Sequence, residues 1–109
     1  MPEKVRVTAA VAKVLAAFLS DATEDRYGLD LMGDTGLPSG TLYPILVRLQ
    51  RAEWVTAEWE DIDPEVAGRP ARRYYRLTPD GLASARTELA ALYQHLSKAE
   101  GAAKKPRTA

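Results

Sequence analysis

The sequence contains no cysteine and a single histidine, His95. A disulfide framework and a thiol nucleophile are excluded, and a transition-metal site is not expected because the sequence has no second histidine and no cysteine to serve as ligands. The acidic residues of segment 58–65 lack the spacing of a calcium loop, and no serine stands in a Gly-x-Ser-x-Gly arrangement. We therefore expect no metal, no cofactor and no enzymatic activity.

Long hydrophobic stretches are also missing. No apolar run approaches the roughly 20 residues that a membrane-spanning helix needs, and the polar residues 1–8 do not form the apolar stretch of a signal peptide. We therefore expect a cytoplasmic protein with no membrane partner. The 109 residues suffice for one domain with a modest core, which an oligomer interface would enlarge.

The chain has no net charge, whereas many DNA-binding proteins are basic overall. Its charges are nevertheless sorted along the sequence. Five acidic and no basic residues lie between Glu58 and Glu65, and four arginines and no acidic residue lie between Val66 and Pro79. A surface sorted in this way can still present one basic face to nucleic acid.

Helical spacing of apolar residues predicts a first helix over residues 8–21, with Thr8 as its N-cap. A short second helix over residues 27–34 and a turn over residues 35–38 follow. Ser39 is the expected N-cap of a third helix that runs to about Ala52. The apolar back of this third helix is formed by Leu42, Ile45, Leu46 and Leu49.

Alternating segments predict a β-hairpin with strands over residues 54–60 and 73–77. The inward residues should be Val55, Ala57, Trp59, Tyr75 and Leu77. The connecting loop, residues 61–72, is long for a hairpin. A last helix should begin at Thr78 and Pro79 and end at Gly101. Its apolar seam is typical of a helix paired with a second subunit and consists of Leu82, Ala85, Leu89, Leu92 and Leu96.

This order of elements predicts a mainly α protein with a small β-hairpin, namely a winged helix-turn-helix plus a C-terminal dimerisation helix. We expect a DNA-binding domain over residues 1–78, a dimerisation helix over residues 79–100 and a disordered basic tail over residues 101–109. The third helix would lie in the major groove with its N-terminal end near phosphate, and the hairpin would flank it as a wing.

The arginines of the hairpin allow more than one interpretation. Arg69, between Gly68 and Pro70, is either extended into a narrow minor groove or solvated in the loop, and the sequence leaves both open. Arg72 and Arg73 are candidates for phosphate contacts. Arg76 is expected to pair across the hairpin with one of the acidic residues Glu58 and Glu60.

Two segments resemble the signature of PadR-family regulators. One runs from Ser39 to Leu49 and includes Tyr43 and Pro44, and the other runs from Arg72 to Gly81. Residues 27 and 28, a Tyr-Gly pair, also match the start of the family's second helix. The resemblance extends over about residues 14–96 and is to the short subfamily, which has a single C-terminal helix. The long, partly acidic wing loop departs from the family pattern.

This resemblance implies a homodimeric transcriptional repressor that binds double-stranded DNA at a pseudo-palindromic operator and is often tuned by a small-molecule effector. With the wing arginines included, the expected DNA-binding residues are Ser39, Gly40, Thr41, Tyr43, Arg48, Arg69, Arg72 and Arg73. The expected dimer interface consists of Val11, Phe18, Leu82, Leu89, Leu92 and Leu96. Tyr93, beside the seam, is a candidate for a ligand pocket between subunits, with simple packing as the alternative.

Two other classes of function stay open. One is a winged-helix protein-interaction module that does not bind DNA, which the zero net charge and the acidic half of the wing loop favour. The other is a sensor defined mainly by a small-molecule pocket at the dimer interface.

Overall fold

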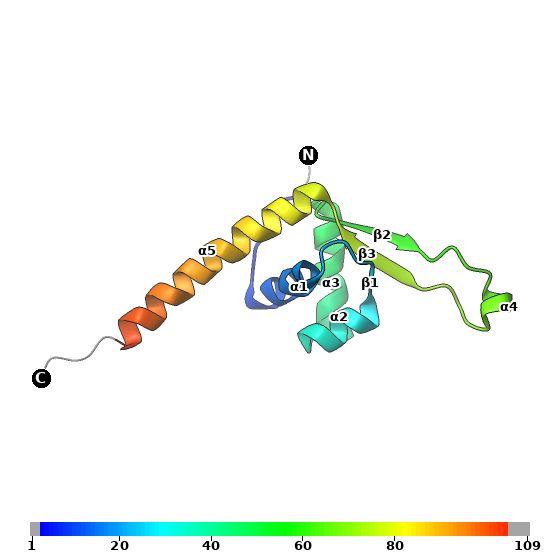
Figure 1. Cartoon of the computed structure of the whole chain (residues 1–109), viewed down its shortest axis with the longest axis horizontal. Coiled ribbons are helices and arrows are strands. Elements are labelled where there is room, and N and C mark those ends of the chain that lie inside the picture. The colour runs from blue at the N-terminus through cyan, green and yellow to red at the C-terminus, as the bar shows by residue number, and fades with distance from the viewer. Residues whose placement is uncertain (1–2, 105–109) are drawn as a thin grey trace, which may run out of the picture.

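The computed structural model describes residues 3–104. Its elements, in chain order, are α1 (Ala9–Ser20), β1 (Arg26–Tyr27), α2 (Gly28–Thr35), α3 (Ser39–Arg51), β2 (Val55–Trp59), α4 (Pro64–Ala67), β3 (Arg73–Leu77) and α5 (Pro79–Lys104). Figure 1 shows α1, α2 and α3 gathered at the sheet, with α5 leaving this body on one side and the β2–β3 hairpin on the other. The predicted mainly α winged-helix fold is confirmed.

The first three helices form around one apolar core. Thr8 caps α1 as predicted, because its hydroxyl oxygen accepts a hydrogen bond from the Val11 N–H at 3.2 Å. The apolar face of α1 then meets α2 and α3, and the fully buried side chains with the largest volume are Phe18, Leu15, Leu31, Leu42, Leu46 and Leu49. Burial of this face holds the three helices together and leaves the opposite face of α3 open.

The sheet has three antiparallel strands in the order β1-β3-β2, one more than the sequence predicts. The hairpin register pairs Val55 with Leu77 and Trp59 with Arg73. The additional strand, β1, is only two residues long, too short for an alternating pattern to reveal it. Tyr75 and Leu77 face the core as expected, whereas the expectation for Trp59 is wrong, since its side chain is 61% exposed at the outer end of the ladder.

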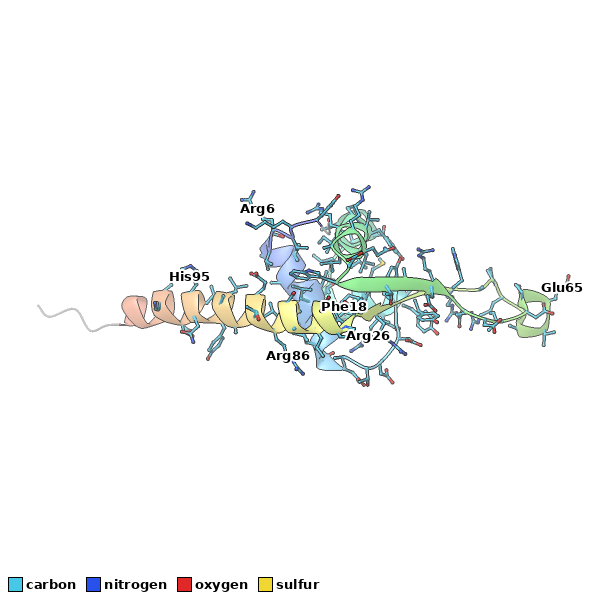
Figure 2. The ribbon with its side chains drawn as sticks, turned by 90° about the horizontal axis from the view of Figure 1, so that it is seen from above. Arg6, Phe18, Arg26, Glu65, Arg86 and His95 are labelled. Atoms are coloured by element: carbon cyan, nitrogen blue, oxygen red, sulfur yellow. The ribbon has the colours of Figure 1, made fainter. Side chains whose placement is uncertain are left out.

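The wing loop contains a short helix that the sequence pattern does not predict. Asp63 caps α4 by accepting a hydrogen bond from the Glu65 N–H at 3.0 Å, and Pro64 is the first helical residue. Gly68 ends the helix with a φ of 70°, a left-handed conformation that glycine adopts without strain. Figure 2 shows Glu65 at the tip of the wing, far from the helical body.

A tight junction joins the wing to the last helix. The Thr78 N–H donates to the Trp54 carbonyl at 2.9 Å, and the Thr78 hydroxyl donates to the Glu53 carbonyl at 2.7 Å. The same hydroxyl accepts from the Gly81 N–H at 2.9 Å, so Thr78 caps α5 as predicted. A Cβ built on Gly81 would lie 1.9 Å from the Trp54 carbonyl oxygen, and this close approach requires glycine.

The seam of α5 is divided between two environments. Ala85 is fully buried, and Leu82 and Leu89 pack against the core of the chain itself. Farther along, Leu96 is 60% exposed. The first half of the seam therefore packs on the chain's own domain, whereas the sequence pattern favours its pairing with a second subunit. Only the second half leaves apolar side chains exposed.

The end of α5 also differs from expectation. The helix continues through Gly101 to Lys104. The rest of the predicted basic tail, residues 105–109, lies outside the described residues. Over residues 3–104, no helix combines the length and apolarity that crossing a membrane requires.

Candidate nucleic-acid interface

The two faces of α3 have opposite character. Its inward side chains, Leu42, Ile45, Leu46 and Leu49, are at most 3% exposed. The outward face is exposed and carries the residues that the sequence pattern and the resemblance assign to DNA, namely Ser39, Gly40, Thr41, Tyr43 and Arg48, with Val47 and Arg51 beside them. A helix divided in this way has the dimensions and the polar surface that fit a DNA major groove. The structure therefore brings these five residues together on one open surface.

The start of α3 corrects one prediction. Pro38, and not Ser39, is the N-cap, and Ser39 is the first helical residue. The Pro38 carbonyl accepts hydrogen bonds from the N–H groups of Thr41 and Leu42, both at 3.0 Å. The first N–H groups of a helix have no acceptor within it, so the amides of Ser39 and Gly40 are suited to an anion such as phosphate.

Tyr43 is partly exposed and partly packed against a neighbouring helix. Its side chain is 41% exposed, yet the ring leans on the first turn of α2. A Cβ built on Gly28 would lie 2.1 Å from the Tyr43 hydroxyl oxygen, so a larger residue there would require the Tyr43 side chain to move. The phenol is thereby positioned between α3 and the N-terminus of α2, with one edge open to solvent.

The base of the wing holds two further candidates. Arg73 lies with its guanidinium carbon 5.4 Å from the centre of the Trp59 ring, a cation–π arrangement. Trp59 lies directly opposite Arg73 at the outer end of the ladder, so the two side chains share one face of the hairpin. Arg72 is exposed, and its backbone N–H donates to Glu60 at 2.8 Å.

A cavity of about 530 Å³ connects the wing with α2 and α3. Its walls are formed by Tyr27, Gly28, Leu29, Asp30, Tyr43, Trp59, Arg72, Arg73 and Tyr75. Burial raises the pKa of the Tyr75 hydroxyl above its ordinary value. The cavity shows that Tyr43, Arg72 and Arg73 face one common space although they come from distant parts of the sequence.

Arg69 occupies neither of the positions considered for it. Its guanidinium binds the Glu60 carboxylate at two points, Nη1 to Oε1 at 2.7 Å and Nη2 to Oε2 at 3.1 Å. This pairing, with the Arg72 N–H and the Tyr27 hydroxyl as further donors, lowers the pKa of Glu60 to about 2. The sequence does not single out Glu60 from the other charged residues of the wing. A linear pattern does not show that the loop folds back and brings Arg69 next to Glu60.

Arg76 also has a partner other than the expected one. It forms an ion pair with Asp25, in the segment before β1, and not with Glu58 or Glu60. The register explains the difference, because Arg76 lies opposite Thr56, while Glu58 lies opposite Tyr74 and accepts a hydrogen bond from its hydroxyl at 2.9 Å.

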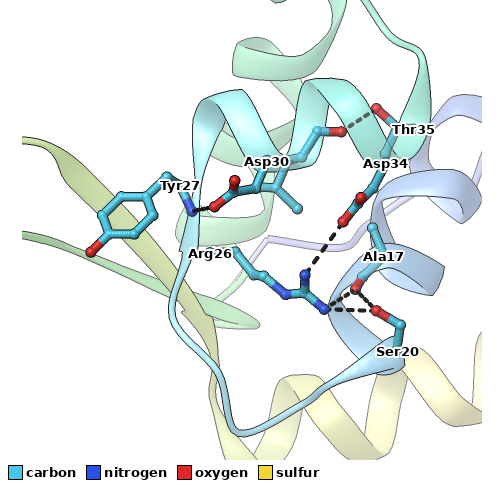
Figure 3. Close-up of polar contacts among 8 residues, drawn as sticks. Ala17, Ser20, Arg26, Tyr27, Asp30, Asp34 and Thr35 are labelled. Carbon is cyan, nitrogen blue, oxygen red and sulfur yellow. Dashed lines mark hydrogen bonds and ion pairs between the residues drawn. The ribbon is translucent and has the colours of Figure 1, made fainter.

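Arg26 fixes α2 against α1 and is absent from the predicted residues. Its Nη2 donates to the Ala17 carbonyl at 3.1 Å and to the Ser20 hydroxyl at 2.7 Å, and its Nη1 pairs with Asp34 at 3.3 Å (Figure 3). The guanidinium therefore bonds to polar groups at the end of α1 and in the last turn of α2, and so links the two helices. Its role is to hold the helix-turn-helix in shape beneath the exposed face of α3.

The residues expected at a dimer interface fall into two groups. Val11 and Phe18 are 2% and 1% exposed within the chain's own core, which leaves them almost no surface for a partner. Leu82, Leu89 and Leu92 are half-buried, and Leu96 is exposed. Tyr93, the candidate ligand-pocket residue, is 72% exposed. Of the predicted interface, only the distal part of α5, residues 89–96, thus has apolar surface that a second subunit could contact.

Within residues 3–104, no three His, Asp or Glu side chains are grouped as the ligands of a metal ion would be. The acidic residues of the wing, Asp61, Asp63 and Glu65, are exposed at its outer part. Chemistry at this surface therefore rests on arginines, hydroxyl groups and helix-terminal amides.

Comparison with known proteins gives a family match over most of the chain. The model of the transcriptional regulator PadR-like family matches residues 17–91. None of the curated proteins matches.

Several solved structures share the fold. A PadR family transcriptional regulator from Eggerthella lenta has 27% identity and a TM-score of 0.65, with 90% of this chain and 87% of that chain covered. A PadR-like transcription factor from Bacteroides fragilis has 26% identity and a TM-score of 0.61, with 84% and 85% covered. BpsR of Bordetella bronchiseptica, whose DNA binding is regulated by 6-hydroxynicotinic acid, has 19% identity and a TM-score of 0.69, with 92% and 69% covered.

Proposed function

The chain belongs to the PadR-like family of transcriptional regulators, and from this premise we propose that it is a repressor that binds a pseudo-palindromic operator as a homodimer. The observation that carries the proposal is the continuous surface formed by the outer face of α3 and the base of the wing. Tyr43, Arg72 and Arg73 line one cavity on that surface. Cations and helix-terminal amides directed to one side are the chemistry that binds a phosphate backbone.

The DNA contacts divide into two kinds. Thr41 and Arg48 stand on the outer face of α3, where side chains reach base edges in the major groove. The amides of Ser39 and Gly40 and the side chains of Arg72 and Arg73 are placed for phosphates. Sequence preference therefore belongs to α3, and most of the general affinity belongs to the wing base and the helix start.

The homodimer would form through the distal half of α5. Leu96 and Tyr93 are exposed there although both are large and apolar in character, and an exposed apolar stripe along a helix is typical of an interface. Two copies joined in this way would present two α3 helices to half-sites one or two helical turns apart. A small-molecule effector that binds near Tyr93, between the two α5 helices, would change this spacing.

The proposal is tested with gel-shift titrations of the full chain against genomic fragments that include the promoter upstream of its own coding sequence. We expect one fragment to be retained at nanomolar protein, with affinity that falls steeply between about 50 and 200 mM salt as counterions are released. Binding that ignores salt, or fails on every fragment at the lowest salt, contradicts the proposal.

The acidic outer wing favours one alternative function. Asp61, Asp63 and Glu65 are exposed there, and such residues repel a phosphate backbone. A winged-helix module that binds a protein would use this part of the wing and would retain no duplex at any salt concentration. The same gel-shift series therefore separates the two functions.

A further inference from the structure

The Glu60 cluster, which we define as Glu60, Arg69, the Arg72 amide and Tyr27, has no role in the DNA contacts described above. Glu60 accepts from the Arg69 guanidinium at 2.7 and 3.1 Å, from the Arg72 N–H at 2.8 Å and from the Tyr27 hydroxyl at 3.3 Å. Its side chain is 11% exposed, and that of Arg69 is 36% exposed. The carboxylate is therefore largely enclosed, and each of its two oxygens accepts two hydrogen bonds.

The two-point pairing keeps the cation of Arg69 occupied. A phosphate binds a guanidinium through the same pair of parallel N–H donors that a carboxylate uses. Glu60 thus occupies one two-donor edge of the guanidinium and offsets its charge, and Nη1 also donates to the Pro70 carbonyl at 3.2 Å. Arg69 is a basic residue of the wing that is withheld from the basic surface.

The cluster also ties the wing to the helix-turn-helix. Tyr27 is the N-cap residue of α2, and its ring meets that of Tyr74 in β3 edge to face, with centroids 6.3 Å apart. Through its hydroxyl, Tyr27 reaches the carboxylate at the end of β2. One side chain, Glu60, therefore joins the returning loop, the residue before β3 and the N-cap residue of α2.

Building on the DNA-binding function proposed above, we propose that Glu60 is a positioning residue that withholds Arg69 from DNA and fixes the wing base against α2. The wing then contributes the cations of Arg72 and Arg73 at a set orientation, and general attraction to any phosphate backbone is kept low. Operator preference gains from this arrangement, because a free arginine on a loop strengthens binding to every sequence alike.

The test uses the variant Glu60→Gln, with Glu58→Gln as its matched control. Glu58 lies two residues earlier on the same strand face and is exposed, so its substitution removes the same charge without releasing Arg69. The probe is a 30-base-pair duplex of random sequence, titrated over a salt series. Glu60→Gln should bind it about three- to fivefold more tightly than Glu58→Gln, with a slope of log affinity against log salt steeper by about 0.9, equivalent to one phosphate.

The double variant Glu60→Gln with Arg69→Ala should lose this gain, whereas Arg69→Ala alone should bind the duplex as the unchanged chain does. Equal affinities and slopes for Glu60→Gln and Glu58→Gln overturn the proposal, and so does a loss of affinity on Arg69→Ala alone. If the unchanged chain binds no duplex, the proposed DNA-binding function is rejected. Hydrogen exchange then tests separately whether Glu60 fixes the wing base. Amides of residues 61–72 should exchange faster in Glu60→Gln than in Glu58→Gln, and equal exchange rejects the proposal.

Discussion

At the scale of single residues, Gly81 fixes the junction where the wing turns into α5. A methyl group there would lie 1.9 Å from the Trp54 carbonyl oxygen, which belongs to the backbone and cannot swing aside. We expect Gly81→Ala to lower the free energy of unfolding by about 2 kcal/mol or more through overpacking. Urea unfolding followed by circular dichroism measures the change.

Gly33 provides the control for this prediction, because it lies inside α2 and a Cβ added there would meet nothing within 4 Å. Gly33→Ala should raise the free energy of unfolding by up to about 1 kcal/mol, as alanine loses less backbone entropy in a helix. Equal effects of the two substitutions would show that the contact with Trp54 is not a constraint.

Glu60 makes stability depend on pH at the same scale. The Arg69 guanidinium, followed by the Arg72 N–H, lowers the pKa of this carboxyl from 4.5 to about 2. The folded pKa lies below the unfolded one, so the stabilisation is complete above about pH 4.5 and is lost as the pH falls toward 2. Between these pH values the melting temperature of the unchanged chain should fall more steeply than that of Glu60→Gln, measured by circular dichroism. Parallel curves for the two chains would contradict the assignment.

At the scale of elements, substitutions in α3 and in the wing base should change DNA binding in different ways. Arg48→Ala should weaken binding to the operator by about 1–3 kcal/mol and leave random duplex nearly unaffected, because it removes the groove contact proposed for Arg48. The double substitution of Arg72 and Arg73 by alanine should weaken binding to both duplexes and reduce the salt slope by about two. Fluorescence anisotropy on the two duplexes separates the effects.

Arg86→Ala serves as the control for these charge changes, since Arg86 is an exposed cation on α5, and Figure 2 shows it directed away from the body. It should alter neither affinity nor slope. If Arg86→Ala and Arg48→Ala reduce binding equally, net charge and not the outer face of α3 governs the affinity.

The elements show what periodicity predicts and where it stops. Helices α1, α3 and α5 and both long strands were predictable, because each buries a regular apolar pattern. β1 and α4 were not, since two strand residues and four helical residues carry no period. The seam of α5 was predictable as an apolar stripe, but whether Ala85 packs on the chain's own core or on a second subunit depends on tertiary contacts.

The part of the candidate site on the outer face of α3 was predictable from the sequence. The outer residues of α3 follow from helical geometry once the buried face is known. The partners of the charged residues do not follow, because Arg69 meets Glu60 only after the loop folds back over nine positions, and Arg76 meets Asp25 only through β1. Long-range ion pairs depend on register and loop conformation, which composition does not encode.

At the scale of the whole molecule, the chain is elongated, with extents of 72 × 31 × 24 Å. Figure 1 shows the distal part of α5 extending beyond the other elements. Leu96 is exposed on this part. We expect Leu96→Glu to weaken self-association at least tenfold, because a carboxylate would be desolvated between two apolar surfaces. Sedimentation equilibrium measures the dissociation constant.

Gln94→Glu is the matched control, since it introduces the same charge two residues away, on another side of α5. It should keep the association of the unchanged chain. A Leu96→Glu variant that associates as tightly as Gln94→Glu would place the interface elsewhere on the molecule.

The Thr78 junction gives this elongated shape a mechanical property. A single residue separates β3 from α5, and its hydrogen bonds to Glu53, Trp54 and Gly81 leave no slack. We therefore expect the angle between the wing and α5 to stay fixed at Thr78. In the proposed dimer, joined through the far end of α5, a small rotation between the subunits would then shift the wing relative to bound DNA.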